Sequence, residues 1–230
     1  MSHASCSKPS VPVLRHTIYW RLCRFIARLL CCLLFRSRWF NGAAVPRTGP
    51  LLIVSNHQSY LDPPLIACGV MHRPLGFLAR AGLFKSRLLA RLLRSFNSVP
   101  LSENGGDVGA MKTTIALLEA GNAVVIFPEG SRTPDGRMGE FKRGTSLIIK
   151  KVNCPVLPVA VEGAFEAWPR HRSLPVPFVH RVWVQFGTPI SHDVLMADGP
   201  DAALRTLEAE VARLRTELRR RMGKPIESSG

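Results

Sequence analysis

The first quarter of this chain has no acidic residue, because no Asp or Glu precedes Asp62. Eight basic residues lie in the same stretch, at positions 8, 15, 21, 24, 28, 36, 38 and 47, and the formal net charge of the 230-residue chain is +15. An acid-free, basic segment is typical of a protein that contacts an anionic surface, either phospholipid or nucleic acid.

Aromatic residues and long apolar runs are also scarce. Nucleic-acid binders interleave aromatic and basic side chains, whereas this chain has only two tyrosines and four tryptophans, so we expect no nucleic-acid partner. The longest apolar run of the N-terminal quarter, residues 29–35, is far shorter than the ~20 residues that span a bilayer. This argues against a conventional transmembrane helix and leaves a cleaved secretory signal as a weaker alternative.

Cysteine and glycine motifs for bound groups are missing as well. The six cysteines have no zinc-type spacing, and Gly105-Gly106 lacks the Lys-Ser/Thr of a phosphate-binding loop. We therefore expect reduced thiols in a cytosol-facing protein and no metal site. A hydrophobic content of 46% with 20% charged residues argues against disorder and for one domain of ordinary size.

Residues 17–38 have the pattern of an amphipathic helix. Its two predicted faces are a basic one, with Arg21, Arg24 and Arg28, and an apolar one, with Leu22, Ile26, Leu29 and Leu33. We expect the apolar face to enter hydrocarbon and the basic face to meet lipid head groups. This predicts attachment to the cytosolic face of the inner membrane, peripheral or shallowly inserted. Two alternatives remain, deep insertion of this helix into the bilayer and packing of the helix on its own domain, because both need the same pattern.

Beyond residue 40, short β-like runs alternate with helical stretches. The predicted strands are 51–55, 75–79, 98–101, 123–127, 156–161 and 182–186. The predicted helices are 63–70, 83–95, 108–120, 143–152 and 201–223. The alternation predicts an α/β fold with a central mixed, largely parallel sheet flanked by helices. We assign residues 1–40 to a basic tail and membrane-associating helix, 41–223 to the α/β domain, and 224–230 to a C-terminal tail.

The segment NHQSYLD, residues 56–62, places His57 five positions before Asp62. On a continuous helix such positions diverge by about 140°, so the side chains can meet only if the chain turns between them. Pro63 favours such a turn, with a helix beginning there. The carboxylate could then hold one ring nitrogen and leave the other facing a hydroxyl. For this pair alone, a polar turn with a helix cap is the simpler interpretation.

A second polar segment, FPEGSR at residues 127–132, follows the apolar run 123–127. It contains Glu129, Gly130 and Arg132, and further cations follow at positions 137, 142 and 143. A surface turn with one ion pair would explain the segment itself. The added cations favour a pocket for an anion, which guanidinium binds well.

Together and in this order, the two segments resemble the 1-acylglycerol-3-phosphate acyltransferase family of glycerolipid acyltransferases. The resemblance covers most of residues 40–165. The matching motifs are His-x4-Asp at His57 and Asp62, Phe-Pro-Glu-Gly-Ser-Arg at 127–132, Phe-Lys-x-Gly at 141–144, and a proline-centred block at 156–160.

This resemblance implies an O-acyltransferase of phospholipid biosynthesis. It would move a fatty acyl group from acyl-CoA or acyl carrier protein to the free hydroxyl of a lyso-glycerolipid, foremost 1-acylglycerol-3-phosphate, giving phosphatidic acid. His57 would be the general base and Asp62 its orienting acid, with no metal or bound cofactor. The implied substrate-binding residues are Glu129, Gly130, Ser131, Arg132, Arg80, Lys142 and Pro158.

One block departs from the family pattern. Arg80 keeps the early charge of the family's second block, but Ser102 stands where an arginine usually ends it. This leaves another lysophospholipid, or an aminolipid precursor, as an alternative acceptor. An alternative of another class is a non-catalytic basic peripheral protein that binds anionic membrane or nucleic acid.

Overall fold

The computed structural model describes residues 18–101 and 106–226. Within them one sheet contains β1 (Arg38–Phe40), β2 (Leu51–Ser55), β3 (Leu75–Arg80), β4 (Ser98–Leu101), β5 (Ala123–Ile126), β6 (Val156–Glu162) and β7 (Trp183–Phe186). The strand order is β1-β7-β6-β2-β5-β3-β4, and every neighbouring pair is parallel except β6 and β7. The predicted α/β fold with a mixed, largely parallel sheet is confirmed.

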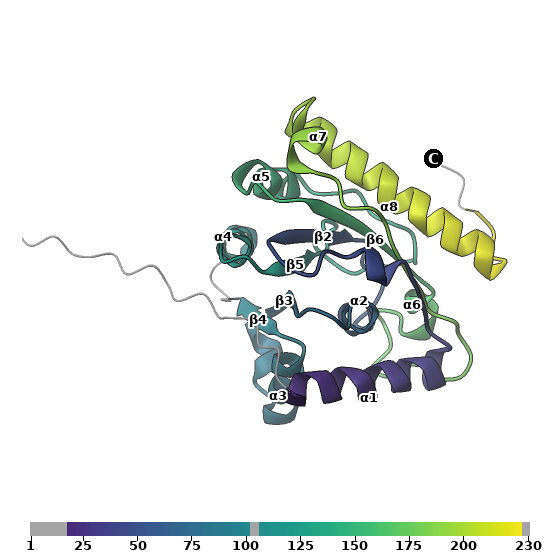
Figure 1. Ribbon diagram of the computed structural model, residues 1–230. Coiled ribbons are helices and arrows are strands. Elements are labelled where there is room, and N and C mark those ends of the chain that lie inside the picture. The colour runs from purple at the N-terminus through teal and green to yellow at the C-terminus, as the bar shows by residue number, and fades with distance from the viewer. Residues whose placement is uncertain (1–17, 102–105, 227–230) are drawn as a thin grey trace, which may run out of the picture.

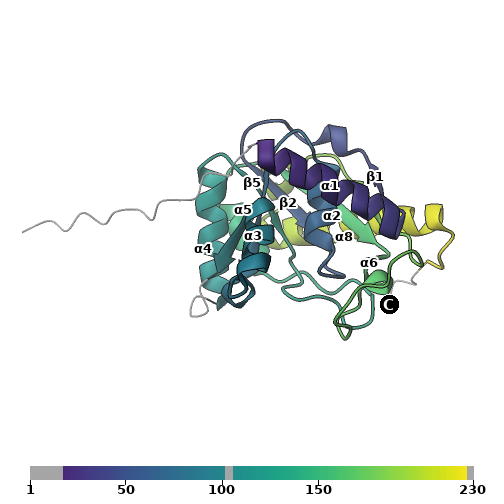
Figure 2. The ribbon, with the colours of Figure 1, turned by 90° about the horizontal axis from the view of Figure 1, so that it is seen from below.

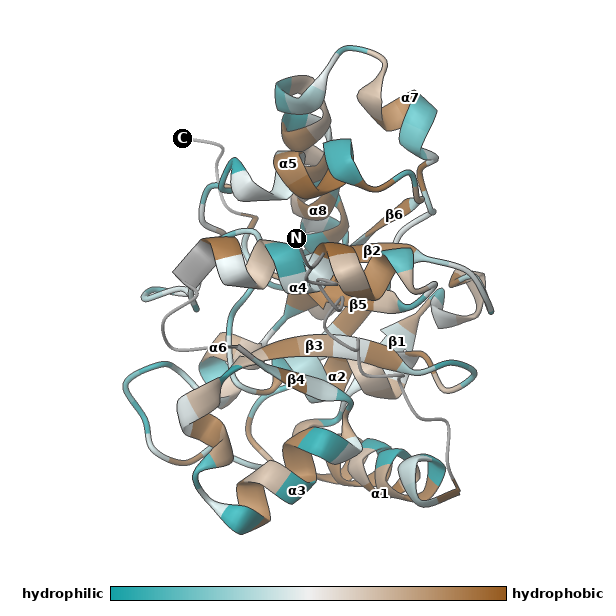
Figure 3. Ribbon diagram, turned by 90° about the vertical axis from the view of Figure 1, so that its left-hand side faces the viewer, coloured by the Kyte–Doolittle hydropathy of each residue, from teal (hydrophilic) through white to brown (hydrophobic). Residues whose placement is uncertain are grey.

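Helices cover both faces of this sheet (Figure 1). They are α1 (Ile18–Phe35), α2 (Asp62–Gly69), α3 (Arg87–Ser95), α4 (Gly106–Glu119), α5 (Gly144–Lys151), α6 (Ala164–Ala167), α7 (His192–Met196) and α8 (Pro200–Met222), with 3-10 helices at Gly42–Ala44 and Ala81–Phe84. One hydrophobic cluster joins α1, α2 and α6 to one sheet face, and a second joins α4, α5 and α8 to the other. Because the middle strands are buried on both sides, they are continuous apolar runs, brown in Figure 3.

The first strand, β1, was not predicted from the sequence. Its three residues pair in parallel with β7 at the sheet edge. A strand of three residues is too short to show the two-residue alternation that identifies longer strands. The sheet therefore begins before residue 41, where we expected the domain to start.

Helix α1 is amphipathic as predicted, but its orientation differs from the expectation. Arg24 is 1% exposed, and its guanidinium donates to the carbonyl oxygens of Val70 and Arg73. Arg28 donates to the carbonyl oxygen of Cys68. The prediction that the basic face meets lipid head groups is therefore wrong for Arg24 and Arg28. They instead donate to carbonyl groups at the C-terminal end of α2, which have no donor within the helix, and to one carbonyl group in the turn that follows.

The apolar face of α1 consequently points away from the domain. Figure 2 shows α1 lying across α2 on the outside of the molecule. The exposed apolar side chains of α1 are Ile18, Tyr19, Leu22, Phe25, Ile26, Leu29, Leu30 and Leu33. No helix in the described ranges is long and apolar enough to cross a bilayer.

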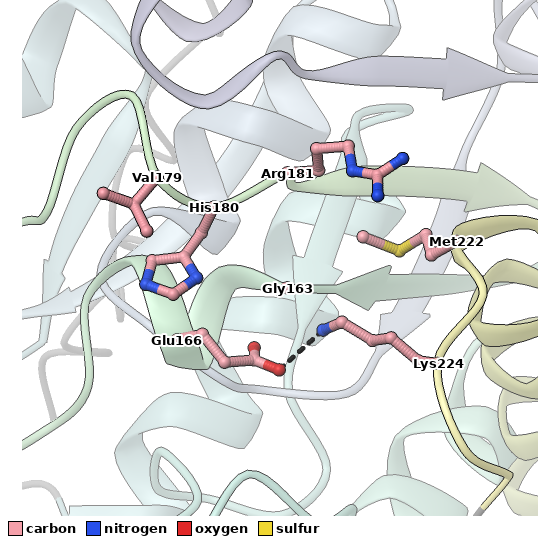
Figure 4. Close-up of a pocket in the computed structure, with 7 residues that line it drawn as sticks. All are labelled: Gly163, Glu166, Val179, His180, Arg181, Met222 and Lys224. Carbon is pink, nitrogen blue, oxygen red and sulfur yellow. Dashed lines mark hydrogen bonds and ion pairs between the residues drawn. The ribbon is translucent and has the colours of Figure 1, made fainter.

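A buried charge cluster attaches α8 to β6. The Glu162 carboxylate is fully buried and lies 2.8 Å from Arg215, 3.0 Å from Arg219 and 2.8 Å from Lys224. Lys224 also pairs with Glu166 of α6 (Figure 4). Burial raises the pKa of Glu162, but Arg215 and Lys224 outweigh it and hold the pKa below its usual value. Lys224 thus belongs to the domain, whereas we expected a tail from residue 224.

We expect Glu162→Gln to destabilise the fold by about 3–5 kcal/mol near neutral pH, because three cations would lose a buried counter-charge. Since the folded-state pKa is lowered, the stabilisation is present above the unfolded-state pKa and is lost as pH falls through the folded-state value. Urea unfolding at several pH values should show the difference from the parent shrinking in acid. The control Glu210→Gln removes a surface pair with Arg213 and should cost less than about 1 kcal/mol.

Candidate active site

The two polar segments lie side by side at one edge of the sheet. Residues 56–62 follow β2 and residues 127–132 follow β5, and these strands pair in parallel from Leu51 with Ala123 onward. The carboxyl ends of β2, β5 and β6 therefore meet at the same edge, where ligands of α/β sheets bind. Parallel pairing thus brings together segments about seventy residues apart in the sequence.

One oxygen of Asp62 organises the turn after β2. Asp62 Oδ2 accepts hydrogen bonds from the backbone N–H groups of Gln58 at 2.6 Å and Ser59 at 2.7 Å. The same oxygen lies 2.8 Å from His57 Nδ1. Because Oδ2 already accepts two N–H groups, Nδ1 must carry the proton and donate it, which leaves Nε2 as the basic nitrogen. Asp62 is thus both the first residue of α2 and the orienting partner of His57.

An aromatic ring packs against the face of the His57 imidazole. Phe127 stacks against it, with the ring centroids 4.0 Å apart and the planes 17° from parallel. The His57 side chain is 17% exposed. Among the described residues no hydrogen-bond partner contacts Nε2. The basic nitrogen is therefore available to a substrate hydroxyl.

Glu129 connects the two segments through backbone groups. Its Oε1 accepts from the His57 N–H at 2.8 Å, and its Oε2 accepts from the Gly139 N–H at 3.1 Å. The Thr133 N–H in turn donates to the His57 carbonyl at 2.9 Å. Burial raises the pKa of Glu129 to about 7, although the two N–H donors oppose the shift. Both backbone polar groups of His57 are therefore bound, one to the second segment and the other to the residue directly after it.

Arg132 is positioned by an aromatic ring rather than by a carboxylate. Its guanidinium carbon lies 3.5 Å from the ring centroid of Tyr60, and Tyr60 contacts Trp168 edge-on at 5.5 Å. Arg132 Nη1 is buried and has no hydrogen-bond partner among the described residues. An unpaired cationic donor at the carboxyl edge of the sheet is suited to bind an anionic substrate group.

A positive backbone angle brings Lys142 against the same turn. Gly130 has φ +72°, which favours glycine, and a Cβ at this position would lie 2.6 Å from Lys142 Nζ. The Lys142 N–H also donates to the Pro128 carbonyl. The turn therefore favours glycine for its conformation, whereas a Cβ at this position would displace only the flexible end of Lys142.

Two polar side chains fasten the turn to β6 and α6. The Asn56 amide bonds both backbone groups of Val161 at 2.9 Å, which continues the pairing of β2 with β6. Gln58 Oε1 accepts from Ala164 N–H at the start of α6. These contacts hold the turn on the side opposite the second segment.

The remaining predicted site residues are less closely gathered. Ser131 is exposed on the turn, and Arg80 is exposed at the carboxyl end of β3, the neighbour of β5. Pro158 is buried inside β6, opposite Val54, so its part in substrate binding stays a prediction. Ser102 lies outside the described residues. In the described ranges no group of three His, Cys, Asp or Glu side chains is placed to hold a metal ion.

Sequence reasoning missed Tyr60, Phe127 and Trp168 as site residues. Tyr60 and Phe127 lie inside the two segments that it identified, but a single aromatic residue in a motif carries no signal of what its ring will contact. Trp168 directly follows α6, and only the fold brings it to the turn.

Comparisons with known proteins agree with this geometry. The family model described as Acyltransferase matches residues 36–162, more than half of the chain. A chloroplastic 1-acyl-sn-glycerol-3-phosphate acyltransferase of Brassica napus is 33% identical over 123 residues, which are 52% of this chain and 35% of that protein. A 1-acyl-sn-glycerol-3-phosphate acyltransferase of Bacillus subtilis is 24% identical over 144 residues, 63% of this chain and 71% of that protein.

The fold has a counterpart among solved structures. The crystal structure of the 1-acyl-sn-glycerophosphate acyltransferase of Thermotoga maritima has a TM-score of 0.73 and 25% identity, covering 87% of this chain and 79% of that one. The chain spans about a third of the length of the plant relatives that it matches. The family match, together with the His57–Asp62 pair and the adjoining Glu129–Arg132 turn, shows that the chain belongs to the Acyltransferase family.

Proposed function

We propose that this protein transfers a fatty acyl group from an acyl thioester to the free hydroxyl of 1-acylglycerol-3-phosphate at a membrane surface. The observation that carries the proposal is the 2.8 Å contact between His57 Nδ1 and Asp62 Oδ2, which leaves Nε2 basic and accessible. A purely structural cap would need Asp62 but not an oriented imidazole stacked on Phe127.

The geometry supports direct transfer. His57 Nε2 removes the proton of the acceptor hydroxyl as its oxygen attacks the thioester carbonyl carbon. The new C–O bond forms, the C–S bond breaks, and the thiolate leaves and takes up a proton. Asp62 stabilises the imidazolium that forms in between. No residue of the chain needs to become acylated in this sequence of steps.

The charge around the turn supports a phosphate-bearing acceptor. The unpaired Nη1 of Arg132 and the ammonium group of Lys142 lie at the same turn, and both are suited to phosphate oxygens. Relatives named 1-acyl-sn-glycerol-3-phosphate acyltransferases favour the same acceptor. Another lysophospholipid is the second candidate, because Ser102 replaces a usual cation. The acyl donor is acyl-CoA or acyl carrier protein.

The outward apolar face of α1 supports peripheral attachment to a membrane. Eight apolar side chains on a single helix face would be costly to leave in water, and burial in the interfacial region offsets that cost. The family's lipid acceptor lies in the same surface. We place this contact on the cytosolic leaflet, with anionic phospholipid as the partner.

We expect His57→Ala to lower the rate of acyl transfer by roughly 10²–10⁴-fold, because it removes the general base. Asp62→Asn should also be severe, since the charge that stabilises the imidazolium is lost. Thioester consumption with a panel of lyso-lipids measures both. The control is His192→Ala on α7, which removes a histidine that also contacts a carboxylate, Asp193, on an exposed helix away from the site. Near-full activity of folded His57→Ala protein would refute the mechanism.

We expect Arg132→Ala to raise the KM for the acceptor by about 10- to 100-fold while the KM for the thioester stays nearly constant. Tyr60→Leu should raise the same constant several-fold, because a cation–π contact contributes about 0.5–2 kcal/mol, and Tyr60→Phe should restore it. Arg205→Ala, which removes an exposed arginine of α8, is the control. An unchanged acceptor KM in Arg132→Ala would place the anion pocket elsewhere.

We expect Phe25→Ser with Leu29→Ser to weaken binding to phospholipid vesicles by about tenfold or more, because each side chain contributes up to about 2 kcal/mol on burial. Vesicle co-sedimentation measures the effect. Part of the parent's binding should persist at high salt, since apolar contact is not screened. Leu147→Ser, equally exposed on α5 at the opposite side of the sheet, is the control and should bind normally. Equal binding by the double variant would contradict the assigned face.

A further inference from the structure

The loop between α6 and β7, residues 168–182, exposes apolar side chains at the edge that carries the site. Leu174 is 76% exposed, Phe178 63% and Val179 64%. They lie among basic residues, of which Arg170, Arg172 and Arg181 are exposed. No Asp or Glu occurs between Glu166 and Asp193. An apolar group with a basic border is the composition that a membrane interface accepts.

The backbone presents Phe178 outward at a conformational cost. Its φ of +67° lies in the left-handed region, which a bulky residue rarely adopts. Such a conformation persists only where the surroundings hold it, and here the Phe178 N–H donates to the carbonyl oxygen of Leu34 at the end of α1. The ring is nonetheless exposed, so burial within the domain does not compensate for the conformation.

Both ends of the loop are attached to elements already described. At its start, the Trp168 carbonyl accepts from Ser59 Oγ at 2.9 Å, beside the Tyr60 ring of the catalytic turn. At its end, the Val182 N–H donates to the Phe35 carbonyl at 3.1 Å. Figures 1 and 2 show the chain after α6 passing the C-terminal end of α1, and Figure 4 shows Val179 and His180 on its last part. The loop is thus attached to the C-terminal end of α1, the helix whose apolar side chains are exposed, and to the turn that contains His57.

From these observations we infer that the α6–β7 loop is a second membrane-contact element, in which Leu174 and Phe178 enter an anionic bilayer beside the active site. The inference rests on the proposed transfer to a membrane lipid and extends it. Contact at α1 alone would leave the distance between site and bilayer free to vary. A second contact at the site edge presents lipid head groups to Arg132 without the acceptor leaving the bilayer.

The test uses the full chain with Leu174→Ser and Phe178→Asn together, because asparagine tolerates the left-handed conformation. The control is Val194→Ser, a residue that is 71% exposed on α7, the helix that lies at the opposite end of the molecule from α1 in Figure 1. We expect partition onto vesicles of phosphatidylglycerol and phosphatidylcholine to fall by about tenfold in the double variant and by less than about twofold in the control. The ratio of the rate on vesicle-embedded acceptor to the rate on dispersed short-chain acceptor should fall equally.

A second pair, Arg170→Gln with Arg172→Gln, separates charge from apolar contact. It should lower partition onto anionic vesicles on the order of 20-fold and leave partition onto pure phosphatidylcholine unchanged. Unchanged vesicle partition in the Leu174/Phe178 variant overturns the inference. A raised KM for acyl carrier protein with unchanged vesicle partition also overturns it, because the loop would then bind an acidic protein. Failure of the proposed function looks different: the parent protein would transfer no acyl group to any lyso-lipid, whatever its partition.

Discussion

Asp62 Oδ2 accepts hydrogen bonds from two consecutive backbone N–H groups and from the imidazole of His57. The two backbone donors hold residues 57–62 in a turn. This turn brings His57 and Asp62 into contact, which a continuous helix would not do for residues five positions apart. Because those donors already define Oδ2 as an acceptor, they also determine which nitrogen of His57 carries its proton. Local folding and the tautomer of His57 therefore depend on the same oxygen.

The helix that begins at this oxygen connects the site to the outer surface. Asp62 opens α2, and Arg24 and Arg28 of α1 donate to carbonyl groups at its other end. A helix C-terminus attracts cationic donors, because its last carbonyl groups have no partner within the helix. Arg24 and Arg28 are used inside the protein for this reason, and the exposed apolar side chains on the opposite face of α1 point outward. The surface proposed to meet lipid is thus a consequence of how α2 is held.

Two buried glutamates at the carboxyl edge of the sheet have pKa values shifted in opposite directions, because their partners differ. Glu162 has three cations within 3.0 Å, and its pKa is lowered. Glu129 has backbone N–H groups as its partners, and burial raises its pKa to about 7. Glu162 can therefore hold α8 as a charged group. Glu129 positions the backbone of His57 and Gly139, and its carboxyl group gains a proton at a pH close to neutral.

The sequence by itself determined the longer strands and the two polar segments, because apolar runs and motif spacing are local properties. The family resemblance added the prediction that His57 is a base, that Asp62 is its acid and that the second segment binds an anion. The sequence could not determine that β1 joins the sheet, since three residues carry no period. It also left open which face of α1 points outward, because an amphipathic pattern is the same in either orientation. Tertiary structure decided that point through the carbonyl groups of α2. It likewise placed Phe127 against His57 and Tyr60 over Arg132, since only the parallel pairing of β2 and β5 brings those rings and charges within contact distance.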